Sequence, residues 1–175
     1  AGVENFSKNV LDSLPKLKCI SRVGVGLDSI DLDYAEKKGV KILNTPDGPT
    51  RSVAEFTLAM ALSLLRKIPQ AHNDMENNIW KKQVGNLFAH KIVGIIGLGR
   101  IGKNVAGLFS SIGFNIIGFD INPDQIWAKK NNIKLKSFNE VISMADILTL
   151  HVPGNINEPL IKEIDFVKMK KESVL

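Results

Sequence analysis

The sequence has few of the residues that build disulfides and metal sites. Its 175 residues include one cysteine, Cys19, so no disulfide can form within the chain. Cys19 lies in an apolar, strand-like run, where a thiol is most simply a small core residue. The three histidines, His72, His90 and His151, are far apart and lack the spacing of metal ligands. We therefore expect a reducing, cytoplasmic setting and no metal.

Long hydrophobic runs are also missing. No apolar stretch is long enough to cross a bilayer, and no basic-then-apolar segment resembles a signal peptide. The formal net charge is +5, but the lysines are spread over expected helix surfaces and loop ends. Nucleic-acid binding needs basic residues gathered on one face, so we favour a solvated surface. We expect neither a membrane nor a nucleic acid as a partner.

The residues that are present suit a globular protein. Hydrophobic residues make up 44% and charged residues 23% of the chain, which is ordinary for a soluble domain. The length is enough for one large domain or parts of two.

One stretch has the strongest pattern in the chain. Residues 92–96 are apolar on both alternating faces, as in a strand buried between two layers of helices. They lead into Gly97-Leu98-Gly99-Arg100-Ile101-Gly102, which has the GxGxxG spacing. A helix is predicted next, because apolar residues recur about once per helical turn from Ile101 to Ile112. A second apolar run over 116–119 ends at Asp120.

Each part of this stretch suits the binding of a dinucleotide. Gly97 allows a tight turn, Gly99 lets a pyrophosphate approach the backbone, and Gly102 lets the helix pack close to the strand. The pyrophosphate would lie at the helix N-terminus, where unpaired N–H groups and the dipole attract an anion. Asp120 would accept hydrogen bonds from the adenosine ribose. The alternative is a glycine turn in an ordinary βαβ unit, with Asp120 capping a loop.

Asp120 also bears on the choice of cofactor. Its carboxylate would repel the 2′-phosphate that distinguishes NADP from NAD. The next residues, Ile121 and Asn122, include no arginine to hold that phosphate. The sequence therefore predicts NAD as the cofactor.

The chain before residue 50 alternates between helical and strand-like patterns. We expect helices over 3–14 and 32–38, the second with Asp31 as its N-cap, and strands over 19–25 and 41–44. This order predicts a parallel βα layer.

A long apolar helix is predicted after this layer. Ser52 and Glu55 fit a capping box, and the helix should continue to about Lys67, before Pro69 breaks or kinks it. The residues of this helix are apolar on almost every face, which predicts that the helix is buried on all sides. The burial could lie at a domain junction or subunit interface, or within one subunit. A second helix or arm is expected over 70–80, where Trp80 suits a core or interface anchor.

The pattern after Asp120 continues the alternation. Residues 123–131 predict a short helix, 134–136 a strand, and Ser137 with Glu140 a capping box that opens another helix. The series is completed by a buried-type strand over 146–152, a helix that contains Leu160, Ile164 and Val167, and a strand beginning at 173. From residue 92 onward the order predicts an α/β fold with a doubly wound parallel sheet.

Four blocks of the sequence carry a wider resemblance, namely Arg22–Asp31, Thr50–Glu55, Gly97–Asp120 and Asp146–Pro153. Together they resemble the D-isomer-specific 2-hydroxyacid dehydrogenase family, and within it the phosphoglycerate-dehydrogenase-like branch. The resemblance implies a partial, flavodoxin-like substrate domain over 1–49. It also implies a Rossmann-type NAD-binding domain over 50–175 that is incomplete at its C-terminus.

The resemblance also implies roles for individual residues. Val25 and Gly26 match the turn whose backbone N–H groups bind the substrate carboxylate, with Val25 also close to the nicotinamide. Val53 matches a position beside the nicotinamide, although it could equally pack inward as a first-turn helix residue. The remaining matches lie at the dinucleotide: Gly97, Gly99, Arg100, Ile101, Gly102, Asp120, His151, Val152 and Pro153. His151 could alternatively do no more than cap the end of a strand.

Members of this family transfer a hydride between NAD and a D-2-hydroxy acid, which here would be 3-phosphoglycerate or a similar acid, and act as homodimers. Their catalytic arginine, glutamate and histidine would lie beyond Leu175, and none of the three histidines here matches the catalytic one. We therefore expect a piece truncated at both ends and inactive by itself. Two departures from the family pattern, Pro49 and the loop over 154–159, leave the 2-hydroxy acid open.

Two other functions fit the same patterns. A non-catalytic NAD-binding regulator, such as the family's transcriptional corepressors, would keep the dinucleotide site without turnover. A purely structural Rossmann-like module would have no affinity for nucleotides.

Overall fold

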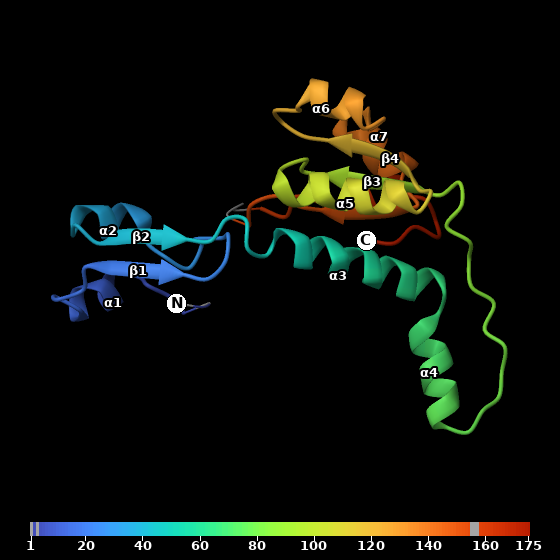
Figure 1. Cartoon of the computed structure of the whole chain (residues 1–175), viewed down its shortest axis with the longest axis horizontal. Helices are drawn as coiled ribbons and strands as arrows, with labels where there is room; N and C mark the ends of the chain where they lie inside the picture. Colours follow the sequence, from blue (N-terminus) through green and yellow to red (C-terminus); the bar gives the residue numbers. More distant parts are fainter. Residues whose placement is uncertain (1, 3, 155–157) are drawn as a thin grey trace. The chain divides into compact units, whose positions relative to one another are not determined.

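The computed structural model describes residues 2, 4–154 and 158–175, so Val3 and residues 155–157 of the predicted loop over 154–159 lie outside the described residues. The chain divides into two compact units (Figure 1). The first is Ala1–Thr50 with Pro153–Glu158, and the second is Arg51–Val152 with Pro159–Leu175. That the first unit is part of a substrate domain stays a prediction.

The first unit is a small parallel βα layer, as the alternation predicts. Strands β1 (Cys19–Arg22) and β2 (Lys41–Asn44) pair in parallel, and α1 (Lys8–Ser13) and α2 (Leu32–Lys37) pack with them. Asp31 caps α2, because its carboxylate accepts a hydrogen bond of 3.0 Å from the Tyr34 N–H. The core of the unit consists of Leu11, Ile20, Ile30, Ala35 and Val40.

Two expectations for this unit are wrong. The helix predicted over 3–14 begins only at Lys8, because Phe6 forms a β-bridge with Ile30 and its backbone bonds to Ser29 and Asp31. Cys19 is exposed rather than in the core. Side chains alternate along a strand, so burial of Ile20 leaves Cys19 on the opposite face.

The helix α3 (Thr50–Leu65) begins three residues before residue 53, where an N-cap at Ser52 would place its first residue, so Ser52 lies inside the helix and is not its N-cap. Within this chain α3 is not buried on all sides, so only the alternative of burial at an interface with another part or subunit stays a prediction. Ala54, Ala61 and Leu65 are buried, whereas Phe56 is 66%, Met60 51% and Leu64 47% exposed.

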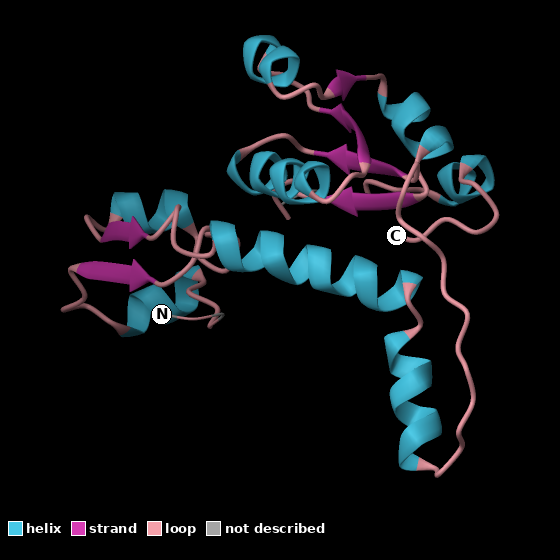
Figure 2. Cartoon of the chain, turned by 45° about the vertical axis from the view of Figure 1, so that its right-hand side comes forward, coloured by secondary structure: helices cyan, strands magenta, loops and turns pink. Residues whose placement is uncertain are grey.

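The predicted break at Pro69 is confirmed. Lys67 adopts the left-handed conformation, with φ of 54°, and α4 (Ile68–Glu76) starts with Pro69 in its first turn. Figure 2 shows α4 turning away from α3, followed by an irregular segment that returns to the sheet. The returning segment is tied to the end of α3, since the Asn86 N–H donates to the Leu65 carbonyl at 2.8 Å.

The second unit is built on a parallel sheet of four strands in the order β5-β4-β3-β6 (Figure 1). The strands are β3 (Ile92–Ile96), β4 (Asn115–Phe119), β5 (Lys134–Leu135) and β6 (Ile147–Leu150). Val174 forms a parallel bridge with Ile147, so the predicted strand beginning at 173 joins the sheet beside β6. This order confirms the doubly wound Rossmann-type sheet.

Helices cover this sheet as the apolar patterns predict. They are α5 (Arg100–Ser111), α6 (Gln125–Lys130), α7 (Phe138–Met144) and α8 (Glu163–Lys168). Phe109 of α5 packs in one cluster with Val93 and Ile95, and Val141 of α7 packs in another with Ile96. Side chains of β3 thus enter clusters on both faces of the sheet, which is why this strand is apolar throughout.

The capping box predicted at the start of α7 is confirmed. The Ser137 side chain accepts from the Glu140 N–H, and the Glu140 carboxylate accepts from the Ser137 N–H at 2.9 Å. Lys136 also donates to Glu140 at 2.9 Å. These contacts, the Lys136 hydrogen bond first, lower the pKa of Glu140 to about 2.

Candidate functional site

The candidate site lies at the carboxyl ends of β3 and β6, which are neighbours in the sheet. From β3 the chain passes through α5 to β4 on one side, while β6 pairs on the other side. The strand order therefore reverses between these two strands. In open α/β sheets a crevice forms at such a switch point, and ligands bind there.

The three glycines of the GxGxxG turn differ in their surroundings. A Cβ on Gly97 would collide with the His151 carbonyl, and a Cβ on Gly102 would collide with the Gly97 carbonyl. Gly97 also has a φ of +92°, which disfavours any other residue. A Cβ on Gly99 would meet nothing within 4 Å. Gly97 and Gly102 are thus required by the protein's own packing, whereas Gly99 leaves open space beside the backbone.

The open space at Gly99 lies at the start of a helix. Gly99 is the N-cap residue of α5 and has no side chain to satisfy the first N–H groups of that helix. Unpaired N–H groups and the positive end of the helix dipole attract phosphate. The turn therefore fits the pyrophosphate of a dinucleotide, and a side chain at residue 99 would occupy the space left for it.

Asp120 lies directly after β4 and connects the strand end to the glycine turn. Its Oδ2 accepts a hydrogen bond of 2.7 Å from the Leu98 N–H, and its Oδ1 accepts one of 2.8 Å from the Asn122 N–H. Each carboxylate oxygen can accept more than one hydrogen bond, so capacity remains for ribose hydroxyls. Sequence reasoning missed the contact with Leu98, although an acid at the end of the neighbouring strand could have suggested it.

His151 joins the turn through its backbone. Its N–H donates to the Ile96 carbonyl at 2.8 Å, and its own carbonyl lies against Gly97. The imidazole Nε2 is 3.0 Å from the Thr149 hydroxyl. Burial lowers the pKa of His151, which favours a neutral ring at pH 7. The side chain of Val152 also lies beside Gly97, whereas Pro153 falls in the first unit.

The remaining predicted residues are placed as follows. Arg100 is exposed, and Ile101 is partly buried against the core. Val25 and Gly26 lie in the first unit and Val53 lies in α3 of the second. Their shared role at a substrate and nicotinamide stays a prediction.

Sequence reasoning also missed an ion pair beside the turn. Lys103 of α5 donates to the carboxylate of Asp124 at 2.7 Å, and its ammonium lies 5.1 Å from the centroid of the Trp127 ring. Asp124 is also the N-cap of α6. Neither residue belongs to the GxGxxG pattern, and they come together only because β3 and β4 are adjacent in the sheet.

The described part of the chain has no side-chain cluster suited to a metal ion and no helix suited to crossing a membrane. No group of three or more histidine, cysteine, aspartate or glutamate side chains there could hold a metal ion. No helix among the same residues is both long and apolar enough to cross a membrane.

Comparisons with known proteins agree with this geometry. The family model described as the NAD binding domain of D-isomer specific 2-hydroxyacid dehydrogenases matches residues 58–175. D-3-phosphoglycerate dehydrogenase from Bacillus subtilis is 40% identical over 149 residues, covering 84% of this chain and 28% of that protein. The corresponding enzyme from Methanocaldococcus jannaschii is 39% identical over 150 residues, covering 84% and 29%.

A solved structure also matches nearly the whole chain. It is D-lactate dehydrogenase from Aquifex aeolicus complexed with NAD and lactic acid, with a TM-score of 0.88 and 29% sequence identity. The match covers 97% of this chain and 52% of that one. This chain thus spans less than a third of the curated relatives and about half of the structural relative.

Proposed function

This chain belongs to the D-isomer specific 2-hydroxyacid dehydrogenase family, and we propose that the protein containing it transfers a hydride between NAD and a D-2-hydroxy acid. The observation that carries the proposal is the glycine turn at the switch point. There the open backbone at Gly99, the uncapped start of α5 and the carboxylate of Asp120 come together.

The residues of this chain bind and orient NAD, and different residues contact different parts of the cofactor. The first N–H groups of α5 hold the pyrophosphate, and Asp120 accepts hydrogen bonds from the adenosine ribose. The further residues proposed to contact NAD are Val25, Val53, Arg100, Ile101, His151, Val152 and Pro153. NAD, when bound, supplies the nicotinamide ring that accepts or donates the hydride.

We propose 3-phosphoglycerate or a similar D-2-hydroxy acid as the substrate. The support is the identity of 40% and 39% to two D-3-phosphoglycerate dehydrogenases. Val25 and Gly26 would bind its carboxylate. The catalytic arginine, glutamate and histidine are expected beyond Leu175, and none is assigned within this chain. A role in serine biosynthesis would follow from that substrate, and the single cysteine supports the proposal of a cytoplasmic setting.

A homodimer is proposed on separate grounds. Phe56, Met60 and Leu64 are exposed at steps of four residues, so they form one apolar stripe on α3. No residue of α4 is buried, and Trp80 in the segment after it is 90% exposed. Contiguous exposed apolar surface of this kind marks interaction sites. The non-catalytic regulatory alternative gains no support from the relatives or from the described residues.

The proposal is tested by titrating the chain with NADH and NADPH, using calorimetry and tryptophan fluorescence. Saturable binding of NADH that is clearly tighter than that of NADPH is expected. Binding of neither dinucleotide would refute the proposed site. For the substrate, NADH oxidation by the full-length protein is compared between the 2-oxo acid derived from 3-phosphoglycerate and pyruvate. A preference for pyruvate would refute the phosphoglycerate assignment.

A further inference from the structure

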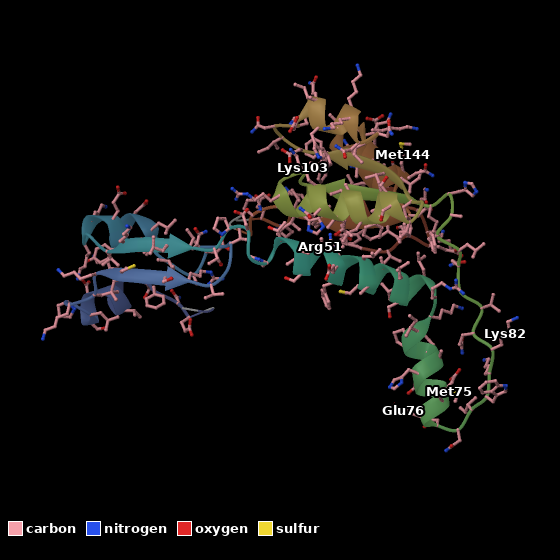
Figure 3. The ribbon with its side chains drawn as sticks, viewed as in Figure 1. Arg51, Met75, Glu76, Lys82, Lys103 and Met144 are labelled. Carbon is pink, nitrogen blue, oxygen red and sulfur yellow. The ribbon has the colours of Figure 1, made fainter. Side chains whose placement is uncertain are left out.

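The ion pair between Lys103 and Asp124 lies on the segment that follows the ribose-binding acid. Lys103 is next to Gly102 on α5, and its side chain extends to Asp124, four residues after Asp120 (Figure 3 labels Lys103). The Nζ–Oδ2 distance is 2.7 Å, and the same ammonium lies over the Trp127 ring. A cation is therefore present beside the segment that carries Asp120, but it already has an anionic partner.

The two oxygens of Asp124 have separate partners. Oδ1 accepts a hydrogen bond of 2.9 Å from the Trp127 N–H and so caps α6, while Oδ2 accepts from Lys103. The hydrogen bond from Lys103 is the largest of the causes that lower the pKa of Asp124. The carboxylate therefore stays ionised at neutral pH, and the pair has no net charge.

This arrangement matters for the phosphate that distinguishes NADP from NAD. That phosphate is attached to the adenosine ribose, the part of the cofactor that Asp120 is proposed to bind. Asp120 is held near the glycine turn by its bonds to Leu98 and Asn122. An unpaired lysine beside the same segment would attract a 2′-phosphate, whereas a lysine paired with a carboxylate attracts it much less.

We propose that Asp124 is a second determinant of the preference for NAD over NADP, because it holds the ammonium of Lys103 that would otherwise attract the 2′-phosphate. This inference rests on the proposed NAD site and adds to it a residue outside the GxGxxG pattern. Asp120 disfavours the phosphate by direct repulsion, and Asp124 does so by occupying the nearby cation.

The test is the variant Asp124→Asn in the full chain. Asparagine is as good an N-cap as aspartate, so α6 keeps its cap while Lys103 loses its charged partner. Dissociation constants for NADH and NADPH are measured by calorimetry at low ionic strength. We expect NADPH to bind roughly three- to tenfold tighter than it does to the unmodified chain, with NADH changed less than twofold. The gain should disappear at high salt, because exposed charges are then screened.

Two further variants separate the charge effect from a structural one. The double variant with Lys103→Gln and Asp124→Asn should lose the gain for NADPH, because no freed cation remains. The matched control is Asp31→Asn, since Asp31 caps α2 in the same way but lies in the first unit. It should leave the affinities for both dinucleotides unchanged. Circular dichroism and thermal melting confirm that each variant is folded.

Four results would overturn the inference. Equal changes in the dissociation constants for NADH and NADPH in Asp124→Asn would mean that the ion pair only holds the start of α6 against α5. A gain for NADPH that persists in the double variant would assign the effect to a group other than Lys103. If the unmodified chain binds neither dinucleotide, the proposed function fails and this inference fails with it. Binding of NADH with an unchanged NADPH ratio would refute the inference alone.

Discussion

Removal of the Asp120 carboxylate should change both the stability of the protein and its affinity for NADH. In the structure this carboxylate accepts hydrogen bonds of 2.7 Å from the Leu98 N–H and 2.8 Å from the Asn122 N–H. Hydrogen bonds to a charged group contribute about 1.5–3 kcal/mol each when buried, and less here because Asp120 is only partly buried. We therefore expect Asp120→Ala to lower the free energy of unfolding by about 1–3 kcal/mol.

The effect on binding is measured separately. Loss of the proposed bonds to the ribose should weaken NADH binding by about 1–3 kcal/mol, which is roughly five- to 150-fold. Urea denaturation without ligand reports the first quantity, and calorimetric titration reports the second. An unchanged free energy of unfolding would mean that the hydrogen bonds from the Leu98 and Asn122 N–H groups make no net contribution to stability. An unchanged affinity would remove Asp120 from the dinucleotide site.

Three further predictions follow from the packing and charges of the chain. Gly102→Ala should lower the free energy of unfolding by about 1–3 kcal/mol or more in urea denaturation, because the added Cβ would collide with the Gly97 carbonyl. In the control Gly107→Ala, on the same helix, the added Cβ meets nothing within 4 Å, and the free energy of unfolding should rise by about 0.5–1 kcal/mol. If the unmodified chain sediments as the proposed dimer, Phe56→Asp should shift it to a monomer without unfolding the chain, and an unchanged dimer would exclude this stripe as the interface. The pKa of Glu140 in the folded protein is lowered from 4.5 to about 2, so its contribution to stability is present above pH 4.5 and is lost as the pH falls towards 2. A plot of the free energy of unfolding against pH should therefore be less steep between these values for Glu140→Gln than for the unmodified chain. Identical slopes would contradict this prediction.

Local patterns in the sequence were sufficient for the order of the elements in the second unit. A strand that is apolar on both faces, a glycine turn and a helix with one apolar stripe are each specified by neighbouring residues, so the sequence predicts β3, α5 and β4. The capping box of Ser137 and Glu140 spans three residues and was equally predictable. The break at Pro69 follows from the covalent structure of proline.

Long-range contacts could not be predicted in the same way. The hydrogen bonds that the Leu98 N–H donates to Asp120 and that Lys103 donates to Asp124 join residues on different elements, and they form because β3 and β4 are adjacent in the sheet. The exposure of Phe56 is a similar case. An apolar composition predicts that the faces of a helix are buried. Only the tertiary structure decides which of those faces are buried by other residues of the same chain.

The sequence by itself thus determined the fold class, the glycine turn proposed to bind NAD and the position of the acid at the end of the next strand, because each depends on residue types at short, regular spacing. Only the tertiary structure decided which charges meet at that turn and which apolar side chains stay exposed. Those outcomes depend on the order in which strands pair, and strand order brings together residues that no local pattern relates.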